Sequence, residues 1–137
     1  MPVMEKTLLI LKPDAVERGL IGRILAKVEE AGLKIVRLNM VRLTPDRAGE
    51  FYSVHASRPF FKDLVTYMSS GPVVACVIEA ESAITRVREL MGATNPANAA
   101  PGTIRAEFAV DIQTNSVHGS DSPESAAGES PFFFPAG

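Results

Sequence analysis

Apolar and polar residues follow two different rhythms along this chain. Unbroken or alternating apolar runs are typical of β-strands, whereas apolar residues that recur every three or four positions are typical of amphipathic helices. The predicted strands are residues 7–11, 34–43 and about 73–78. The predicted helices are residues 21–31, 44–55, 61–68 and 82–91. Strands that alternate with amphipathic helices predict a two-layer α/β sandwich.

Cap and turn residues mark the ends of several of these elements. Thr44 is a typical N-cap residue, and Pro45 suits the first position of the helix that follows. Gly32 is a typical residue at which a helix stops. The turn at residues 70–72 leads into the strand that holds Cys76. Local turn chemistry and hydrophobic periodicity therefore indicate the same boundaries.

Residues 92–102 form a long segment without a charge and almost without large apolar side chains. Its two prolines and two glycines would suit a flexible linker. Long irregular loops inside compact domains are, however, usually functional. We therefore expect an ordered loop that contributes to a site.

The composition is that of a globular protein. The 137 residues predict a single domain, residues 1–137, which can bury about two-thirds of its unfolded surface without disulfides or metals. Apolar residues make up 46% of the chain and charged residues 22%, which is an ordinary balance. The net charge of −2 argues against a general nucleic-acid-binding role, because that role needs a basic excess.

Cysteine usage and hydropathy exclude several further classes. Cys76 is the one cysteine, so there is no intrachain disulfide, and its apolar neighbours predict a small buried side chain. Paired cysteine and histidine spacings typical of structural zinc are lacking. Apolar runs are too short for a signal peptide or a membrane span, so we expect a cytoplasmic protein without membrane association.

The most polar segment, residues 115–121, sets His118 beside a glycine, a hydroxyl and carboxylates. Such an imidazole is sterically open to attack, and Ser120 and Glu129 are close enough in sequence to hold its second ring nitrogen. The alternative is a turn before a helix, in which Ser120 and Asp121 serve as N-cap residues. The segment alone leaves both interpretations open.

Six sequence blocks match the pattern of a known protein family. Because all six occur in the same order, a chance match is negligible. They are residues 12–16, 58–61, 70–74, 88–96, 100–105 and 115–122. Over nearly its whole length the chain resembles nucleoside diphosphate kinases. The resemblance implies a ferredoxin-like antiparallel four-stranded sheet covered by helices. It also implies transfer of the γ-phosphoryl group from a nucleoside triphosphate such as ATP to a nucleoside diphosphate, which maintains NTP and dNTP pools.

The resemblance assigns the chemistry to a phosphohistidine intermediate and ping-pong kinetics. His118 would be the nucleophile, through Nδ1. Glu129 would accept a hydrogen bond from the other ring nitrogen, with Ser120 bridging, and Tyr52 would help to hold the imidazole. The other histidine, His55, reads instead as a partner of a helix C-terminus.

Side chains must bind the phosphates, because the chain contains no P-loop motif and no kinase-type glycine loop. The resemblance places Lys12, Arg88 and Arg105 on the β- and γ-phosphates, and arginine suits this role because its planar fork pairs with phosphate oxygens. An isolated Arg88 would otherwise be read as a surface charge. Thr94 would add a hydroxyl donor.

The nucleoside would be held by few polar contacts. Phe60 would stack on the base, which explains a tolerance for purines and pyrimidines, while the neighbouring Phe61 is the better core aromatic. Asn115 and Lys12 match positions that hydrogen-bond the sugar hydroxyls. Because the sequence shows no full carboxylate cage, we expect Mg²⁺ to arrive on the nucleotide phosphates, with Asp121 as an outer-shell partner.

Two departures from the family pattern concern the end of the chain. Gly128 costs about 1 kcal/mol relative to alanine inside a helix, and Pro131 is expected to end that helix, so Glu129 is less rigidly held. The apolar tail, residues 131–137, is short but is expected to pack on its own domain or on a neighbouring subunit. We expect a homo-oligomer, either a tetramer or a hexamer.

A different class of function is a non-catalytic nucleotide-binding or regulatory module that has kept the fold. Such a module is expected to have lost the histidine or one of the cations. Every position carried over from the family pattern retains its residue, which favours the enzyme.

Overall fold

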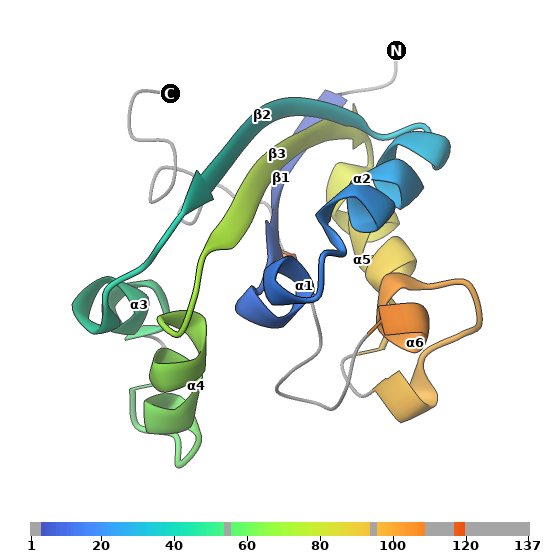
Figure 1. Cartoon of the computed structure of the whole chain (residues 1–137). Helices are drawn as coiled ribbons and strands as arrows, with labels where there is room; N and C mark the ends of the chain where they lie inside the picture. The colour runs from blue at the N-terminus through green and yellow to red at the C-terminus, as the bar shows by residue number, and fades with distance from the viewer. Residues whose placement is uncertain (1–3, 54–55, 94–95, 109–116, 120–137) are drawn as a thin grey trace.

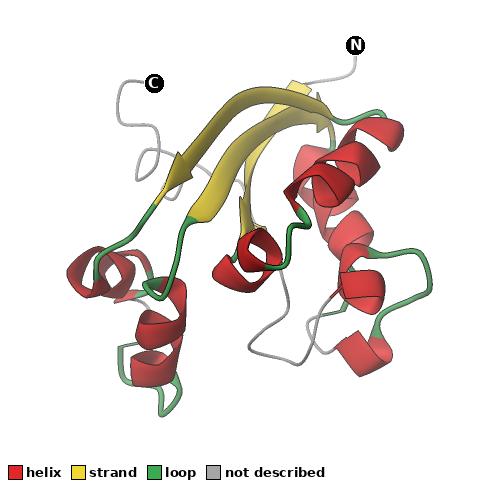
Figure 2. Ribbon diagram, viewed as in Figure 1, coloured by secondary structure: helices red, strands yellow, loops and turns green. Residues whose placement is uncertain are grey.

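A computed structural model describes residues 4–53, 56–93, 96–108 and 117–119. Its centre is a four-stranded sheet in which every neighbouring pair is antiparallel (Figure 2). The strands are β1 (Met4–Leu11), β2 (Lys34–Val41), β3 (Val73–Glu81) and β4 (Val117–Gly119), in the order β2-β3-β1-β4. The predicted antiparallel four-stranded sheet is confirmed.

The helices flank the sheet and its ends (Figure 1). They are α1 (Pro13–Glu17), α2 (Ile21–Glu30), α3 (Pro45–Phe51), α4 (Phe61–Met68), α5 (Ala83–Met91) and α6 (Ile104–Phe108), with a 3-10 turn η2 (Pro96–Asn98). α4 has the predicted bounds. Thr44 caps α3 as expected, because its Oγ1 accepts a hydrogen bond from the Arg47 N–H at 3.2 Å.

The central strands divide their side chains between two apolar clusters. Leu9 and Leu11 of β1 pack with residues of α2 and α5 on one face of the sheet. Leu8 and Ile10 point to the other face and pack with residues of α3 and α4. Because successive residues of a strand face opposite sides, one continuous apolar run serves both clusters. Cys76 of β3 is fully buried in the first cluster, as predicted, and burial raises the pKa of its thiol to about 12.

β2 is one of the two edge strands of the described sheet, and the structure corrects the prediction for it. The strand ends at Val41, two residues earlier than expected, although Leu43 is still buried. Leu38 and Met40 are each 55% exposed. Their apolar side chains are therefore not buried within this one chain, although the sequence pattern alone would suggest that they are.

Two short helices, α1 and α6, were not predicted. Each has five residues, which is too short for a 3.6-residue period to appear in the sequence. Local caps explain them instead: Pro13 occupies the first turn of α1, and the Thr103 hydroxyl accepts a hydrogen bond from the Ala106 N–H at the start of α6.

The described part of the 92–102 segment is built into the domain. It contains η2, and Gly92 at its start has a φ of +86°, a conformation that favours glycine. At its end, Lys27 of α2 donates to the Gly102 carbonyl at 3.2 Å and pairs with Glu107 of α6 at 2.8 Å. These contacts favour the ordered loop over the linker.

Candidate active site

His118 lies at the middle of β4, and the sheet determines its place. It pairs with Ile10 of β1, while Val117 pairs with Leu11 and Gly119 with Leu9. The His118 side chain is half-buried, whereas both neighbours are buried. β4 also packs tightly on α5, because a Cβ at Gly119 would come within 2.8 Å of the Met91 sulfur. A glycine after His118 therefore allows the close approach of strand and helix.

Two aromatic rings from the end of α3 stand edge-on to the imidazole. The ring centroids of Tyr52 and His118 are 6.0 Å apart, and those of Phe51 and His118 are 5.8 Å apart. Both ring planes are nearly perpendicular to the imidazole, at 82° and 77°. Edge-to-face packing of this kind restricts rotation of the imidazole. Tyr52 was expected beside His118 and lies there; Phe51 was not assigned to the site.

The two arginines attach to the strand on either side of the histidine. Arg105 of α6 donates through Nη2 to the Val117 carbonyl at 2.9 Å and through Nη1 to the Gly92 carbonyl at 3.0 Å. Arg88 of α5 donates through Nη1 to the Gly119 carbonyl at 3.4 Å. Val117 and Gly119 flank His118, so both guanidinium groups are held beside β4, the strand that carries the imidazole. The structure thus brings together residues that are far apart in the sequence.

Lys12 follows β1 directly and is almost as buried as Arg105. Their exposed fractions are 7% and 6%, whereas Arg88 is exposed. Burial, followed by the positive charge of Arg105, lowers the pKa of Lys12 to about 8, and Asp14 acts in the opposite direction. Burial, followed by Arg88, lowers the pKa of Arg105 to about 10.

Within the part of the chain that the structure describes, no carboxylate forms an ion pair with Arg88 or Arg105. The Arg105 Nε is also buried and has no hydrogen-bond partner among the described residues. Clustered cations that are removed from water attract an anion strongly, and an unused guanidinium N–H can donate to one. The arrangement is therefore suited to bind phosphate groups beside an imidazole.

Phe60 stands immediately before α4. Its side chain is 47% exposed, which is unusual for a large aromatic, whereas Phe61 packs against the cluster that contains Tyr52. The prediction that Phe61 serves the core is confirmed. An exposed aromatic ring offers a stacking surface.

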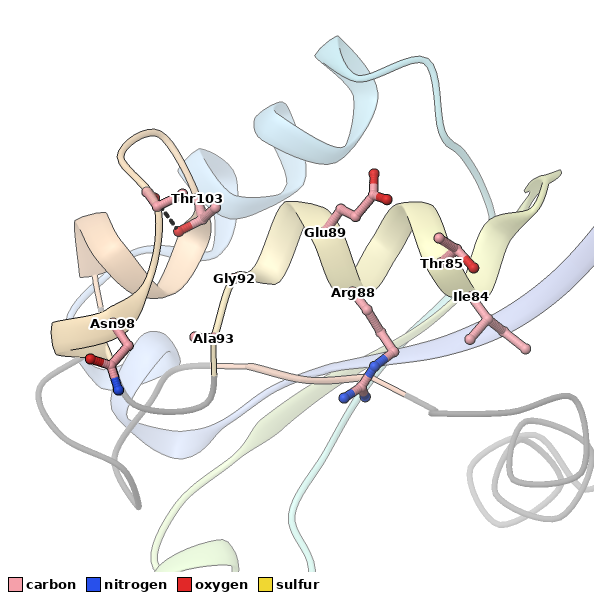
Figure 3. Close-up of a pocket in the computed structure, with 9 residues that line it drawn as sticks. Ile84, Thr85, Arg88, Glu89, Gly92, Ala93, Asn98 and Thr103 are labelled. Carbon is pink, nitrogen blue, oxygen red and sulfur yellow. Dashed lines mark hydrogen bonds between the residues drawn. The ribbon is translucent and has the colours of Figure 1, made fainter.

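A cavity of about 680 Å³ lies between α5 and the 92–103 segment (Figure 3). Arg88 lines it, but His118, Lys12 and Arg105 do not. Arg88 reaches from α5 toward β4, while Glu89 points away on another side of the helix (Figure 3). We therefore regard the cavity as adjacent to the candidate site and not as the site itself.

Several expected site residues lie outside the described residues. They are Thr94, Asn115, Ser120, Asp121 and Glu129. His55, which was expected at a helix C-terminus, and Gly128, Pro131 and the rest of the apolar tail also lie outside them. The roles predicted for them stay predictions. Conversely, sequence reasoning did not use Asp14, a buried carboxylate two residues after Lys12. Its only sequence signal was its place within the block 12–16.

The described residues also bear on metals and membranes. Among them, no three His, Cys, Asp or Glu side chains lie close enough together to hold a metal ion. No helix in the same set is long and apolar enough to cross a bilayer.

Fold and site together define an α+β domain that presents a half-buried histidine among buried cations. The family model for nucleoside diphosphate kinase matches residues 5–137, and the chain belongs to this family. It is 59% identical over 134 residues to the nucleoside diphosphate kinase of Nitratidesulfovibrio vulgaris, covering 98% of this chain and 96% of the relative. It is 60% identical over 131 residues to that of Rhodospirillum centenum, covering 96% and 94%.

A solved structure supports the same assignment. The fold matches the crystal structure of the Aquifex aeolicus nucleoside diphosphate kinase with a TM-score of 0.94 and 53% sequence identity. The match covers 96% of each chain. The ferredoxin-like architecture implied by the sequence blocks is therefore confirmed.

Proposed function

We propose that this protein is a nucleoside diphosphate kinase that transfers the γ-phosphoryl group of a nucleoside triphosphate to a nucleoside diphosphate. Membership of the family supports the reaction class. One observation on this chain carries the proposal. Arg105 and Arg88 donate hydrogen bonds to the carbonyls of Val117 and Gly119, the residues on either side of His118. A nucleophile and phosphate-binding cations are thereby fixed to one short strand.

In the first half-reaction, a ring nitrogen of His118 attacks the γ-phosphorus. A P–N bond forms while the bond between the γ-phosphorus and the β,γ-bridging oxygen breaks, and the nucleoside diphosphate leaves with the bonding electrons. In the second half, a terminal β-phosphate oxygen of the acceptor diphosphate attacks phosphohistidine, which restores the imidazole. Donor and acceptor use the same site in turn, so the kinetics are ping-pong.

The imidazole must keep one orientation through both halves. The edge-on rings of Tyr52 and Phe51 support that orientation from the side of α3. We assign Glu129 and Ser120 to the second ring nitrogen, where a carboxylate fixes the tautomer and favours the positive charge that develops on the ring.

Lys12, Arg88 and Arg105 would neutralise the β- and γ-phosphates. Phosphoryl transfer depends mainly on positioning and charge stabilisation, and cations that are already held in place need little rearrangement. Arg105 is anchored by two carbonyls and Lys12 is buried, so both are positioned before a nucleotide arrives. Thr94 would add a hydroxyl to the same phosphates.

The nucleoside would extend from the phosphates toward α4. Phe60 would stack on the base through its exposed ring, which every base can accept. Asn115 and Lys12 would bind the sugar hydroxyls. With stacking as the main contact to the base, purine and pyrimidine nucleotides would be accepted alike.

The described residues fit Mg²⁺ bound through the nucleotide and not in a protein cage. They contain no cluster of three metal-binding side chains, and the side chains gathered around His118 are cations and aromatic rings. When bound, Mg²⁺ would supply charge neutralisation on the phosphates. Asp121 would hold it through water.

We also propose that this one domain works in the cytoplasm as a homo-oligomer, either tetrameric or hexameric. The exposed Leu38 and Met40 on edge strand β2 support association, because a sheet edge with apolar side chains seldom remains uncovered. Light scattering at micromolar concentration tests this, and a stable, active monomer would refute it.

The direct test of the function is the intact mass of the protein after mixing with ATP and Mg²⁺. One phosphoryl group should be gained, should be lost on addition of a nucleoside diphosphate, and should be labile to acid but stable to alkali. His118→Ala should gain none and should lose turnover. Binding of ATP without phosphorylation would instead identify a nucleotide-binding module, and full turnover of His118→Ala would refute the mechanism.

A further inference from the structure

A chain of side-chain contacts joins α4, α1 and α6. The Tyr67 hydroxyl of α4 donates a hydrogen bond to Oδ1 of Asp14 in the first turn of α1. Arg18 directly follows α1, and its Nη1 lies 3.9 Å from Oδ2 of the same carboxylate. The same Nη1 also donates to the Phe108 carbonyl at the end of α6. The Tyr67 and Arg18 hydrogen bonds span 53 and 90 positions of the sequence, so they connect parts of the fold that no local signal relates.

Each of these three helices is associated with a side chain assigned above to the nucleotide. Phe60 stands immediately before α4, Lys12 stands immediately before α1, and Arg105 lies within α6. Lys12 and Arg105 are buried, whereas the Phe60 ring is 47% exposed. The backbone of Phe60 leads directly into α4, so the position of α4 determines where this ring stands.

Apolar packing alone would hold α4 only loosely in direction. α4 packs against α3 at one end of the sheet (Figure 1), and its apolar residues face the cluster that contains Leu8 and Ile10. The hydrophobic effect is non-directional, whereas a hydrogen bond requires a narrow geometry. Phe60 and Tyr67 are seven positions apart, which places them about two helical turns, or roughly 10 Å, from each other along the axis. A directional bond near one end of α4 therefore limits the tilts that would displace the other end.

The acceptor of this bond suits it to the role. Asp14 is 7% exposed, and a buried carboxylate that loses a donor is costly, which makes the bond worth more than one at the surface. Burial, followed by the hydrogen bond to Asp14, raises the pKa of the Tyr67 phenol above its ordinary value, so the hydroxyl keeps the proton that it donates. The turn after α4 also rests on α1, because a Cβ at Gly71 would lie 3.8 Å from the Cβ of Pro13.

We propose that the hydrogen bond from Tyr67 to Asp14 fixes α4 against α1, which makes Tyr67 a positioning residue for the Phe60 ring. The ring is thereby held at a set place relative to Lys12. The inference rests on the proposed function, because the contacts of Phe60 and Lys12 with a nucleotide are proposed there. Tyr67 and Asp14 themselves do not touch the nucleotide, and their effect on it passes through Phe60.

The first experiment needs no nucleotide and measures amide hydrogen exchange in the full chain. Tyr67→Phe deletes one hydroxyl and keeps the ring, so exchange in α4 should become about tenfold faster while exchange in α5 stays unchanged. Thr66→Val is the matched control, because it deletes a hydroxyl whose hydrogen bond, to the Lys62 carbonyl at 3.0 Å, stays within α4. It should change the exchange of α4 by less than about twofold.

Two outcomes of the exchange experiment would overturn the inference. Unchanged exchange in α4 of Tyr67→Phe would show that the bond does not fix this helix. Equally faster exchange in α4 and α5 would show a general contribution to stability and no local positioning. If Tyr67→Phe does not fold, Asp14→Ala removes the same bond from the acceptor side and carries the same expectation for exchange.

The second experiment tests the consequence for the nucleotide. Tyr67→Phe should raise the KM for ATP about threefold, with kcat within about twofold of the wild type. Inhibition by inorganic tripolyphosphate, which offers phosphates without a base, should not change. In a Phe60→Ala background, Tyr67→Phe should raise KM no further, because there is no ring left to position. Thr66→Val should leave the KM for ATP unchanged.

The kinetic outcomes separate this inference from the proposed function. An equal rise of KM in the Phe60→Ala background, or weaker inhibition by tripolyphosphate, would show that the bond does not act through the ring and would overturn the inference. A wild-type protein that transfers no phosphoryl group would instead refute the proposed function. Hydrogen exchange would then still decide whether Tyr67 fixes α4.

Discussion

The two ends of the candidate site are built in opposite ways. At the phosphate end, Lys12 and Arg105 are buried, and Arg105 is anchored to the carbonyls of Gly92 and Val117. At the base end, Phe60 is half-exposed at the start of α4. If the proposed roles hold, the rigid side chains are those that would bind the phosphates common to every nucleotide, and the base would meet only an exposed stacking surface. In the proposed binding mode, that difference would make the chemistry depend on phosphate geometry and not on base identity.

Rigidity at the phosphate end has an energetic consequence. Burial lowers the pKa values of Lys12 and Arg105, which means that the folded protein disfavours both charges relative to water. Pre-placed charges of this kind are typical of active sites, where stability is given up for function. Arg88 is exposed and carries less of this penalty. The three cations should therefore respond differently to mutation.

Arg105→Ala should have the largest effect. It removes a cation, two hydrogen bonds to carbonyls and packing beside β4, so kcat should fall about a hundredfold or more and the free energy of unfolding by about 2–4 kcal/mol. Steady-state kinetics and urea unfolding measure the two losses. A near-normal kcat in a destabilised protein would show that the guanidinium is structural and does not contact phosphate.

Arg88→Ala is the matched comparison. This arginine makes one longer hydrogen bond, of 3.4 Å, from an exposed position. We expect a fall in kcat of about tenfold with a change in unfolding free energy within about 0.5 kcal/mol. Stability losses as large as those of Arg105→Ala would remove the distinction between a buried and an exposed cation.

Lys12 should make activity and stability depend on pH in opposite directions. Activity should fall as pH rises through about 8, because neutral lysine attracts phosphate less. Its pKa is lower in the folded protein than the ordinary 10.5, so between about 8 and 10.5 the unfolded chain binds more protons. Stability therefore rises with pH over that window.

Lys12→Met isolates this contribution. The variant should be more stable than the wild type below pH 8, and its advantage should shrink as pH rises to 10.5. Parallel curves of unfolding free energy against pH would show that the Lys12 amine is not perturbed by folding.

Phe60→Ala should give the smallest effect, and one confined to binding. The KM for ATP, GTP and CTP should rise by a similar factor, about three- to tenfold, with little change in unfolding free energy, because the ring is half-exposed. Phe61→Ala should do the reverse, with a loss of stability of about 2 kcal/mol or more, since Phe61 packs against the apolar cluster. A strongly base-dependent effect of Phe60→Ala would mean that the site reads base identity.

Local signals in the sequence determined much of the secondary structure. The apolar period over residues 61–68 matched α4, and the Thr44–Pro45 pair correctly marked the start of α3. Such signals lie within a few residues of the element that they specify, which is why they can be read from one sequence. The same applies to the sequence blocks that identified the family, since each places its residue types at fixed spacing.

The tertiary structure alone decided the strand order, the exposure of Leu38 and Met40, and the burial of Lys12 and Arg105. It also decided that Asp14 meets Tyr67, 53 positions away. Burial and charge pairing depend on what the rest of the chain places around a side chain. The local sequence around a lysine that follows a strand is the same whether that lysine is solvated or buried. The sequence therefore determined which chemical groups this protein has and in which local elements they lie, whereas long-range packing decided which of them share a low-dielectric site and act on one another.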